Sequence, residues 1–287
     1  MFPASFEYHR AASVKDALSI LQQFGEDAKL LSGGHSLLPM MKLRLAQPAH
    51  LVDIGGIRDL RQIKQEGGKI VIGGLVTHHQ VESSDLIRGQ LGLLAECATL
   101  IGDVQVRNRG TIGGSLAHAD PAADYPAAVL ALEAEIRIEG SAGTRTVKAG
   151  DFFVDLMTTA IKPGEILTQV AFAPLGAGAG YAYLKHRQPA SGFAIVGVAA
   201  LVALDKSGNL ERVRVGITGL GAKAFRAQGV EAAQVGKAPD GIAAAAAHAP
   251  DGIDALADIH ASADFRAELA RVYTRRALER AVARAKR

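Results

Sequence analysis

Apolar residues recur with helical spacing near the start of the chain. Val14, Leu18 and Leu21 share one face of a helix. Ser13 can cap the beginning of this helix, and Gly25 can end it, because glycine readily adopts the left-handed backbone that closes many helices. We therefore predict a helix over 14–24.

From this helix to residue 172, short strands alternate with short helices. We predict strands at 28–31, 51–54, 61–65, 69–72, 135–139, 144–148 and 165–172. We predict helices at 37–45, 78–82, 91–100, 121–134 and 150–157, with Ser36, Thr77 and Pro121 at the starts of three of them. We expect two hairpins, one that pairs 61–65 with 69–72 and one that pairs 135–139 with 144–148. The polar segment 103–110 is expected to be extended. This pattern indicates a mixed α+β fold.

The pattern changes at a run of small residues, Pro174-Leu175-Gly176-Ala177-Gly178-Ala179-Gly180. Such a run is typical of a linker. Beyond it, longer apolar segments predict three antiparallel strands at 181–187, 192–204 and 210–220, and helices follow at 242–248 and from about residue 262. We therefore expect two domains, 1–177 and 178–287, the second built from about three strands with helices.

The composition is typical of a globular protein that does not bind nucleic acid and does not span a membrane. Of the 287 residues, 48% are hydrophobic and 21% are charged, which is enough apolar material for a sizeable core. The formal net charge is only +3, and the basic residues near the C-terminus alternate with apolar ones, as on a solvated helix face. No apolar run reaches the ~18 residues of a membrane span, and no signal peptide is recognisable. We expect a cytoplasmic protein.

The reactive residue types limit the chemistry of the chain. Cys97 is the one cysteine, whereas an iron–sulfur cluster takes about four cysteine ligands, so this chain alone cannot hold one. Cys97 lies among apolar residues and is interpreted as a buried, unreactive side chain. His78 and His79 are adjacent on a predicted helix and point in different directions, so no metal site is expected. No nucleophile elbow or paired carboxylates are recognisable, and we expect no catalytic residue.

Two short glycine segments stand out as candidate binding elements. The first glycine segment is Ser32-Gly33-Gly34-His35-Ser36, and the second glycine segment is Thr111-Ile112-Gly113-Gly114-Ser115. A diphosphate needs backbone N–H donors that can approach closely, and paired glycines with neighbouring hydroxyls provide them. Neither segment has the GxGxxG or GxxxxGK[ST] spacing. The pattern alone leaves diphosphate binding and simple close packing equally open.

The surroundings of both segments resemble a known family. The stretches 31–39 and 111–124 are similar to the FAD-binding medium subunit of molybdenum hydroxylases, and aerobic carbon monoxide dehydrogenase is the nearest type. The resemblance extends over essentially the whole chain, including the stretches 72–78 and 265–278. It implies an FAD-binding domain of the vanillyl-alcohol-oxidase type in two subdomains, followed by a small C-terminal flavoprotein domain.

The resemblance also implies a set of FAD contacts. They are Ser32, Gly33, Gly34, His35, Ser36, Leu37, Ile101, Thr111, Ile112, Gly113, Gly114, Ser115, Asp124, Leu167 and Lys185. A cation at Lys185 would favour the anionic form of the reduced flavin. Local sequence alone leaves two alternatives open: Asp124 could instead favour a helix dipole, and Lys185 could be a surface charge. Phe193 occupies the place of a tyrosine that can stack on the flavin in carbon monoxide dehydrogenase relatives.

The function that the resemblance implies is electron transfer within a larger enzyme. Electrons would pass from a molybdenum–pterin cofactor on a large subunit, through [2Fe–2S] clusters on a small subunit, to FAD on this chain and then to an external acceptor. The assembly is expected to be a dimer of such heterotrimers. A stand-alone FAD oxidoreductase and a nucleotide-binding regulatory module are the alternatives. The substrate stays open among carbon monoxide, purines, N-heterocycles and aldehydes, and so does the acceptor.

Overall fold

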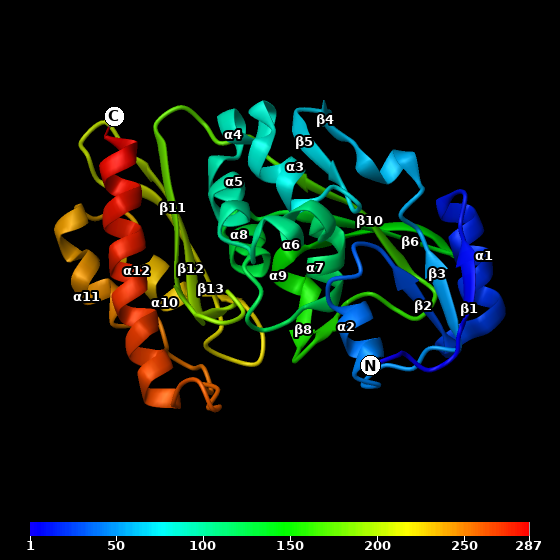
Figure 1. Ribbon diagram of the computed structural model, residues 1–287. Coiled ribbons are helices and arrows are strands. Elements are labelled where there is room, and N and C mark those ends of the chain that lie inside the picture. Colours follow the sequence, from blue (N-terminus) through cyan, green and yellow to red (C-terminus); the bar gives the residue numbers. More distant parts are fainter. Residues whose placement is uncertain (287) are drawn as a thin grey trace.

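Three larger sheets and one two-stranded ribbon carry the fold in the computed structural model, which describes residues 1–286 (Figure 1). Helices cover these sheets, and the mixed α+β character that the sequence predicts is confirmed. Within the described residues, no helix combines the length and the apolar character that crossing a bilayer would demand.

The N-terminal subdomain is a parallel sheet in the order β1-β3-β2, covered by helix α1. The Ser13 hydroxyl caps α1 by accepting a hydrogen bond from the Asp16 N–H, and Gly25 ends the helix with a φ of 54°, as predicted. The elements up to the end of this subdomain are β1 (Glu7–Arg10), α1 (Val14–Phe24), η1 (Gly25–Asp27), β2 (Ala28–Leu31), α2 (Leu37–Lys42), β3 (His50–Asp53) and η2 (Arg58–Arg61).

The second subdomain is an antiparallel sheet in the order β4-β5-β10-β6-β7. Its strands are β4 (Ile63–Glu66), β5 (Lys69–Gly73), β6 (Glu135–Gly140), β7 (Gly143–Lys148) and β10 (Ile166–Phe172), and β8 (Phe153–Asp155) pairs with β9 (Thr158–Thr159) beside it. Its helices are α3 (His78–Ser83), α4 (Asp85–Gln90), α5 (Gly92–Thr99), α6 (Val104–Arg109), α7 (Ile112–His118), α8 (Tyr125–Ala131) and α9 (Ala149–Phe152). Both predicted hairpins, β4–β5 and β6–β7, are confirmed.

The C-terminal sheet has the order β11-β12-β13-β14 and is antiparallel. Its elements are β11 (Ala179–Arg187), β12 (Ala194–Leu204), β13 (Leu210–Thr218), β14 (Phe225–Arg226), α10 (Gln228–Gln234), η3 (Pro239–Gly241), α11 (Ile242–Ala246) and α12 (Ala263–Ala285). Helix α12 packs on β11 and β12, while α8 and α5 also contact this sheet (Figure 1). The three predicted strands are confirmed, and the two-residue β14 was too short for any pattern to reveal. The exact domain boundary at residue 177 stays a prediction.

Three local predictions are wrong, each for an identifiable reason. The polar segment 103–110 contains helix α6, because Asp103 caps it by accepting a hydrogen bond from the Val106 N–H. Pro121 lies in a loop, and α8 begins only at Tyr125, with Pro126 in its first turn. The predicted helix 150–157 ends at Phe152, where the two-stranded ribbon begins.

Candidate functional site

A cleft of about 1010 Å³ runs along both glycine segments. Its other walls come from β2, from the stretch that joins β9 to β10, and from the loop that joins β11 to β12. Pockets for small ligands usually have volumes of roughly 300–1,000 Å³, so this cleft is large enough for a dinucleotide. The two segments therefore line one site, although about eighty residues separate them in the sequence.

The first glycine segment leaves β2 and presents unpaired backbone donors to the cleft. Gly34 has a φ of 76°, in the left-handed region that favours glycine. Within residues 1–286, the N–H groups of Gly33, Gly34, His35 and Ser36 have no hydrogen-bond partner. Consecutive free N–H groups form an anion-binding concavity. The prediction that the Ser36 side chain caps α2 is wrong, because that side chain makes no capping bond.

The second glycine segment differs, because it is the start of helix α7. The Thr111 hydroxyl caps the helix by accepting a hydrogen bond from the Gly114 N–H. The N–H groups from Ile112 to Ser115 donate, in chain order, to Val76 O, Gly74 O, Thr111 Oγ1 and Thr111 O. The expectation that this segment repeats the free backbone donors of the first is therefore wrong. It contributes to the cleft the hydroxyls of Thr111 and Ser115 and the backbone of Gly113 and Gly114.

Direct contact joins the two segments. The Ser32 and Thr111 hydroxyl oxygens lie 2.7 Å apart. A Cβ on Gly33 would lie 2.3 Å from the Arg109 carbonyl oxygen, so only glycine permits this approach. A Cβ on Gly114 would lie 2.9 Å from the Thr111 hydroxyl oxygen and 3.7 Å from that of Ser32, at the junction that lines the cleft. The glycines thus serve different purposes: Gly33 allows the two backbones to approach, whereas Gly114 leaves space for the contact between the Ser32 and Thr111 hydroxyls.

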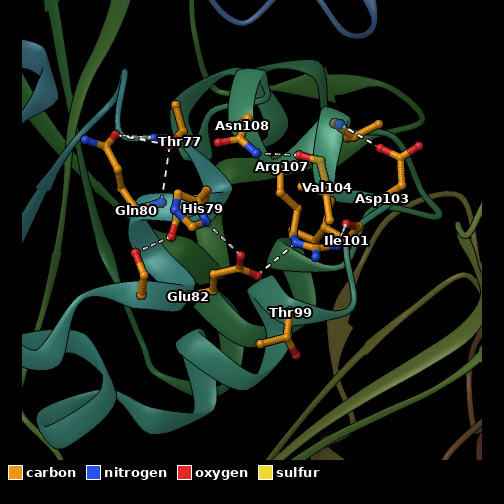
Figure 2. A network of polar contacts seen from close by, with 12 residues as sticks. Thr77, His79, Gln80, Glu82, Thr99, Ile101, Asp103, Val104, Arg107 and Asn108 are labelled. Atoms are coloured by element: carbon orange, nitrogen blue, oxygen red, sulfur yellow. Dashed lines mark hydrogen bonds and ion pairs between the residues drawn. The ribbon is translucent and has the colours of Figure 1, made fainter.

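A polar network fixes the backbone that leads into the second segment (Figure 2). Arg107 on α6 forms an ion pair with Glu82 on α3 at 2.8 Å, and it donates a hydrogen bond to the Ile101 carbonyl at 3.2 Å. Both charged side chains are 17% exposed. Ile101 lines the cleft, so this network holds one of the predicted contacts in place.

Asp124 is buried at the start of α8 and binds two residues of β11. The Tyr183 hydroxyl donates to one carboxylate oxygen at 2.5 Å, and the Lys185 ammonium donates to the other at 2.9 Å. Lys185 also donates to the Gly192 carbonyl at 2.6 Å. Burial raises the pKa of Asp124 above the usual carboxyl value, while Lys185 and Tyr183 act in the opposite direction. Asp124 lines the cleft, whereas Lys185 lies behind it.

His78 lines the cleft, although the sequence indicated no role for it. It is 4% exposed, its Nδ1 has no partner among the described residues, and its ring packs edge-on against Tyr125. Burial lowers the pKa of His78 to about 3, with smaller effects of His35 and Arg107, so the ring is neutral near pH 7. A water molecule or a bound ligand in the cleft can supply the missing partner of such a buried polar atom.

The structure brings most of the predicted contacts together. Thirteen of them line the cleft: Ser32, Gly33, Gly34, His35, Ser36, Leu37, Ile101, Thr111, Gly113, Gly114, Ser115, Asp124 and Leu167. Ile112 is buried in the core and Lys185 lies behind Asp124, so neither lines the cleft. Phe193 also lines it and is 43% exposed. The segment 157–166 adds lining residues that no sequence motif indicated.

Two protein families match this chain, one after the other. Residues 4–174 match the FAD binding domain in molybdopterin dehydrogenase. Residues 181–281 match the CO dehydrogenase flavoprotein C-terminal domain. The first match contains the first and second subdomains with both glycine segments, and the second match contains most of the C-terminal sheet and α12.

Relatives of known activity match over nearly the full length. The chain is 42% identical to the carbon monoxide dehydrogenase medium chain of Hydrogenophaga pseudoflava, with 99% of each chain covered. It is 38% identical to the 6-hydroxypseudooxynicotine dehydrogenase complex subunit alpha of Paenarthrobacter nicotinovorans, covering 100% of this chain and 97% of the relative.

Solved structures agree with these relatives. The fold matches the carbon monoxide dehydrogenase from Hydrogenophaga pseudoflava with a TM-score of 0.96 at 43% identity, over 99% of each chain. It matches quinoline 2-oxidoreductase from Pseudomonas putida 86 with a TM-score of 0.93 at 32% identity, over 100% of each chain. The chain therefore belongs to the FAD-binding subunits of the molybdopterin-dependent dehydrogenase family, of the carbon monoxide dehydrogenase type.

Proposed function

We propose that this chain carries FAD as the electron-transfer subunit of a molybdenum hydroxylase whose other redox centres lie on partner chains. The observation that supports this most directly is the cleft that combines free backbone donors with both glycine segments, within a domain that matches an FAD-binding family. When bound, FAD would supply the capacity to accept electrons and pass them on.

The residues of the cleft suit the parts of FAD in different ways. The free N–H groups of Gly33 to Ser36 would bind the diphosphate, and the hydroxyls of Thr111 and Ser115 would add polar contacts beside them. Asp124 would contact the cofactor directly, because it reaches the cleft. Lys185 would act through Asp124 and through the Gly192 carbonyl, which it holds in place.

We infer partner chains because this chain has too few cysteines to hold an iron–sulfur cluster. An iron–sulfur cluster takes about four cysteine ligands, and the chain has one cysteine, which is fully buried. The relatives are named as a medium chain and as a subunit of a complex. We infer a small subunit with [2Fe–2S] clusters and a large subunit with a molybdenum–pterin cofactor. The dimer of such heterotrimers and the cytoplasmic location are parts of the same proposal.

The decisive experiment compares the isolated chain with the assembled enzyme. The chain is expressed alone and together with the chains encoded beside it, and flavin absorption is followed without oxygen after adding carbon monoxide, nicotine, a purine or an aldehyde. We expect both preparations to contain FAD, and we expect one of these substrates to bleach the flavin in the assembled enzyme only. Bleaching by an organic substrate in the isolated chain would instead support a stand-alone oxidoreductase. Absence of bound flavin from both preparations would refute the proposal.

A further inference from the structure

Two histidines and a glutamate meet on the N-terminal sheet, at a place that the proposed function does not use. In the parallel pairing of β1 with β3, Glu7 lies directly opposite His50. His9 is two residues beyond Glu7 on β1, and alternate residues of a strand point to the same face. All three side chains therefore belong to one face of the sheet, although His9 and His50 are 41 positions apart.

The three donor atoms form a triangle of the size that a metal ion requires. His9 Nε2 lies 3.1 Å from His50 Nδ1. A carboxylate oxygen of Glu7 lies 3.4 Å from His50 Nδ1 and 3.9 Å from His9 Nε2. Ligands at about 2.0–2.1 Å from a tetrahedral Zn²⁺ are about 3.3 Å from one another. A small rotation of the exposed Glu7 side chain would therefore place all three atoms on one ion.

The surroundings orient the rings and leave room for a further ligand. Phe24, the last residue of α1, stacks on His50 with ring centres 3.7 Å apart and planes inclined by 17°. The side chains of His9, His50 and Glu7 are 25%, 16% and 72% exposed. None of these three residues lines the cleft. The arrangement therefore has fixed imidazoles on one side and water on the other.

We propose that Glu7, His9 and His50 bind one divalent cation of the Zn²⁺ type, with water in the remaining position. Two imidazoles and one carboxylate suit zinc, copper or nickel, whereas magnesium and calcium prefer oxygen ligands. The ion would fasten β1 to β3, and so would hold the first strand of the chain to the sheet. Sequence spacing gave no indication of this site, because a strand pairing, not a local motif, brings the ligands together.

The test uses the full chain with its FAD and without a polyhistidine tag. Zn²⁺ binding is measured by titration calorimetry, and Co²⁺ is added separately because tetrahedral cobalt has a characteristic visible absorption. We expect one ion per chain and no displacement by excess Mg²⁺. Loss of a single ligand should weaken binding about 100-fold or more, because even indirect support of a ligand is worth about 10- to 100-fold.

Three variants separate the site from general effects. Glu7→Gln removes a ligand from an exposed position, so it leaves the fold and the FAD content intact. His50→Ala removes a second ligand. His248→Ala is the matched control, because His248 pairs with Asp251 and lies far along the chain from the three ligands. The proposal holds if the first two variants lose the ion and the control retains it. It is overturned if the wild type binds no Zn²⁺, or if Glu7→Gln binds it with unchanged affinity.

Discussion

The Lys185 ammonium lies 2.9 Å from the Asp124 carboxylate, and the two side chains are only 3% and 4% exposed. Lys185 belongs to the C-terminal sheet, whereas Asp124 precedes helix α8 and reaches the cleft. The family resemblance implies two separate cofactor contacts at these positions. The geometry makes them one unit, in which the C-terminal domain holds a carboxylate at the cofactor cleft.

The variant Lys185→Met should destabilise the protein by about 3–5 kcal/mol, because it leaves Asp124 charged, buried and without its cation. FAD retention should weaken at the same time, since Asp124 and the Gly192 loop both lose their support. Urea unfolding followed by circular dichroism measures the first effect, and the flavin-to-protein ratio measures the second.

A double variant and a surface control sharpen this prediction. Asp124→Asn combined with Lys185→Met should recover part of the lost stability, because no unpaired charge then remains. Lys206→Met changes an exposed lysine in a turn and should alter stability by less than about 0.5 kcal/mol. If Lys185→Met behaves like Lys206→Met, the ion pair does not hold the carboxylate.

The junction of the glycine segments gives a second prediction. Gly114→Val should abolish FAD retention, because its side chain would lie at the Ser32–Thr111 contact beside the cleft. Gly34→Val should do the same by straining a backbone with a φ of 76°. Gly89→Val is the matched control, since a Cβ there meets no atom within 4 Å and Gly89 does not line the cleft. Flavin absorption after gel filtration is the measurement, and retention of FAD by both cleft variants would contradict the diphosphate clamp.

The neutral His78 gives a prediction about pH. Its pKa in the folded protein is about 3, below the value of about 6.5 for an unfolded histidine. Below pH 6.5, the unfolded chain therefore binds a proton at His78 that the folded chain does not. The contribution of His78 to the free energy of unfolding is complete above pH 6.5 and is lost as the pH falls. Between pH 7 and pH 5 the loss should be about 2 kcal/mol.

His78→Gln removes this titration and keeps a polar side chain of similar size. We expect the free energy of unfolding of the variant to fall less steeply between pH 7 and pH 5 than that of the wild type. All other titrating groups are the same in both proteins, so the difference between the two slopes isolates His78. Equal slopes would mean that the pKa of His78 is the same in the folded and unfolded chains, which would contradict the lowered pKa.

The sequence predicts those features that are determined by residues close together in the chain. The helix from Val14 and the β4–β5 hairpin follow from spacing, caps and turns within a few residues. The helix after Asp103 differs from the prediction because a single side-chain cap starts it within a polar stretch. The two glycine segments and the family resemblance are sufficient to predict the position of the site. The pairing of Asp124 with Lys185 and the burial of His78 were not accessible, because both arise from packing between distant segments.

The last residue of the predicted linker, Gly180, packs against helix α12 and gives a further prediction. A Cβ on Gly180 would lie 1.9 Å from the Ala281 carbonyl oxygen of α12, so β11 and α12 approach too closely for any side chain. Gly180→Ala should therefore force the helix away from the sheet and destabilise the protein by about 1–3 kcal/mol or more. Gly176→Ala, four residues earlier, meets no atom within 4 Å and should leave stability unchanged. Thermal unfolding compares the two variants, and limited proteolysis reports whether α12 is released. Equal stability of the two variants would show that the segment behaves as a free linker up to the sheet.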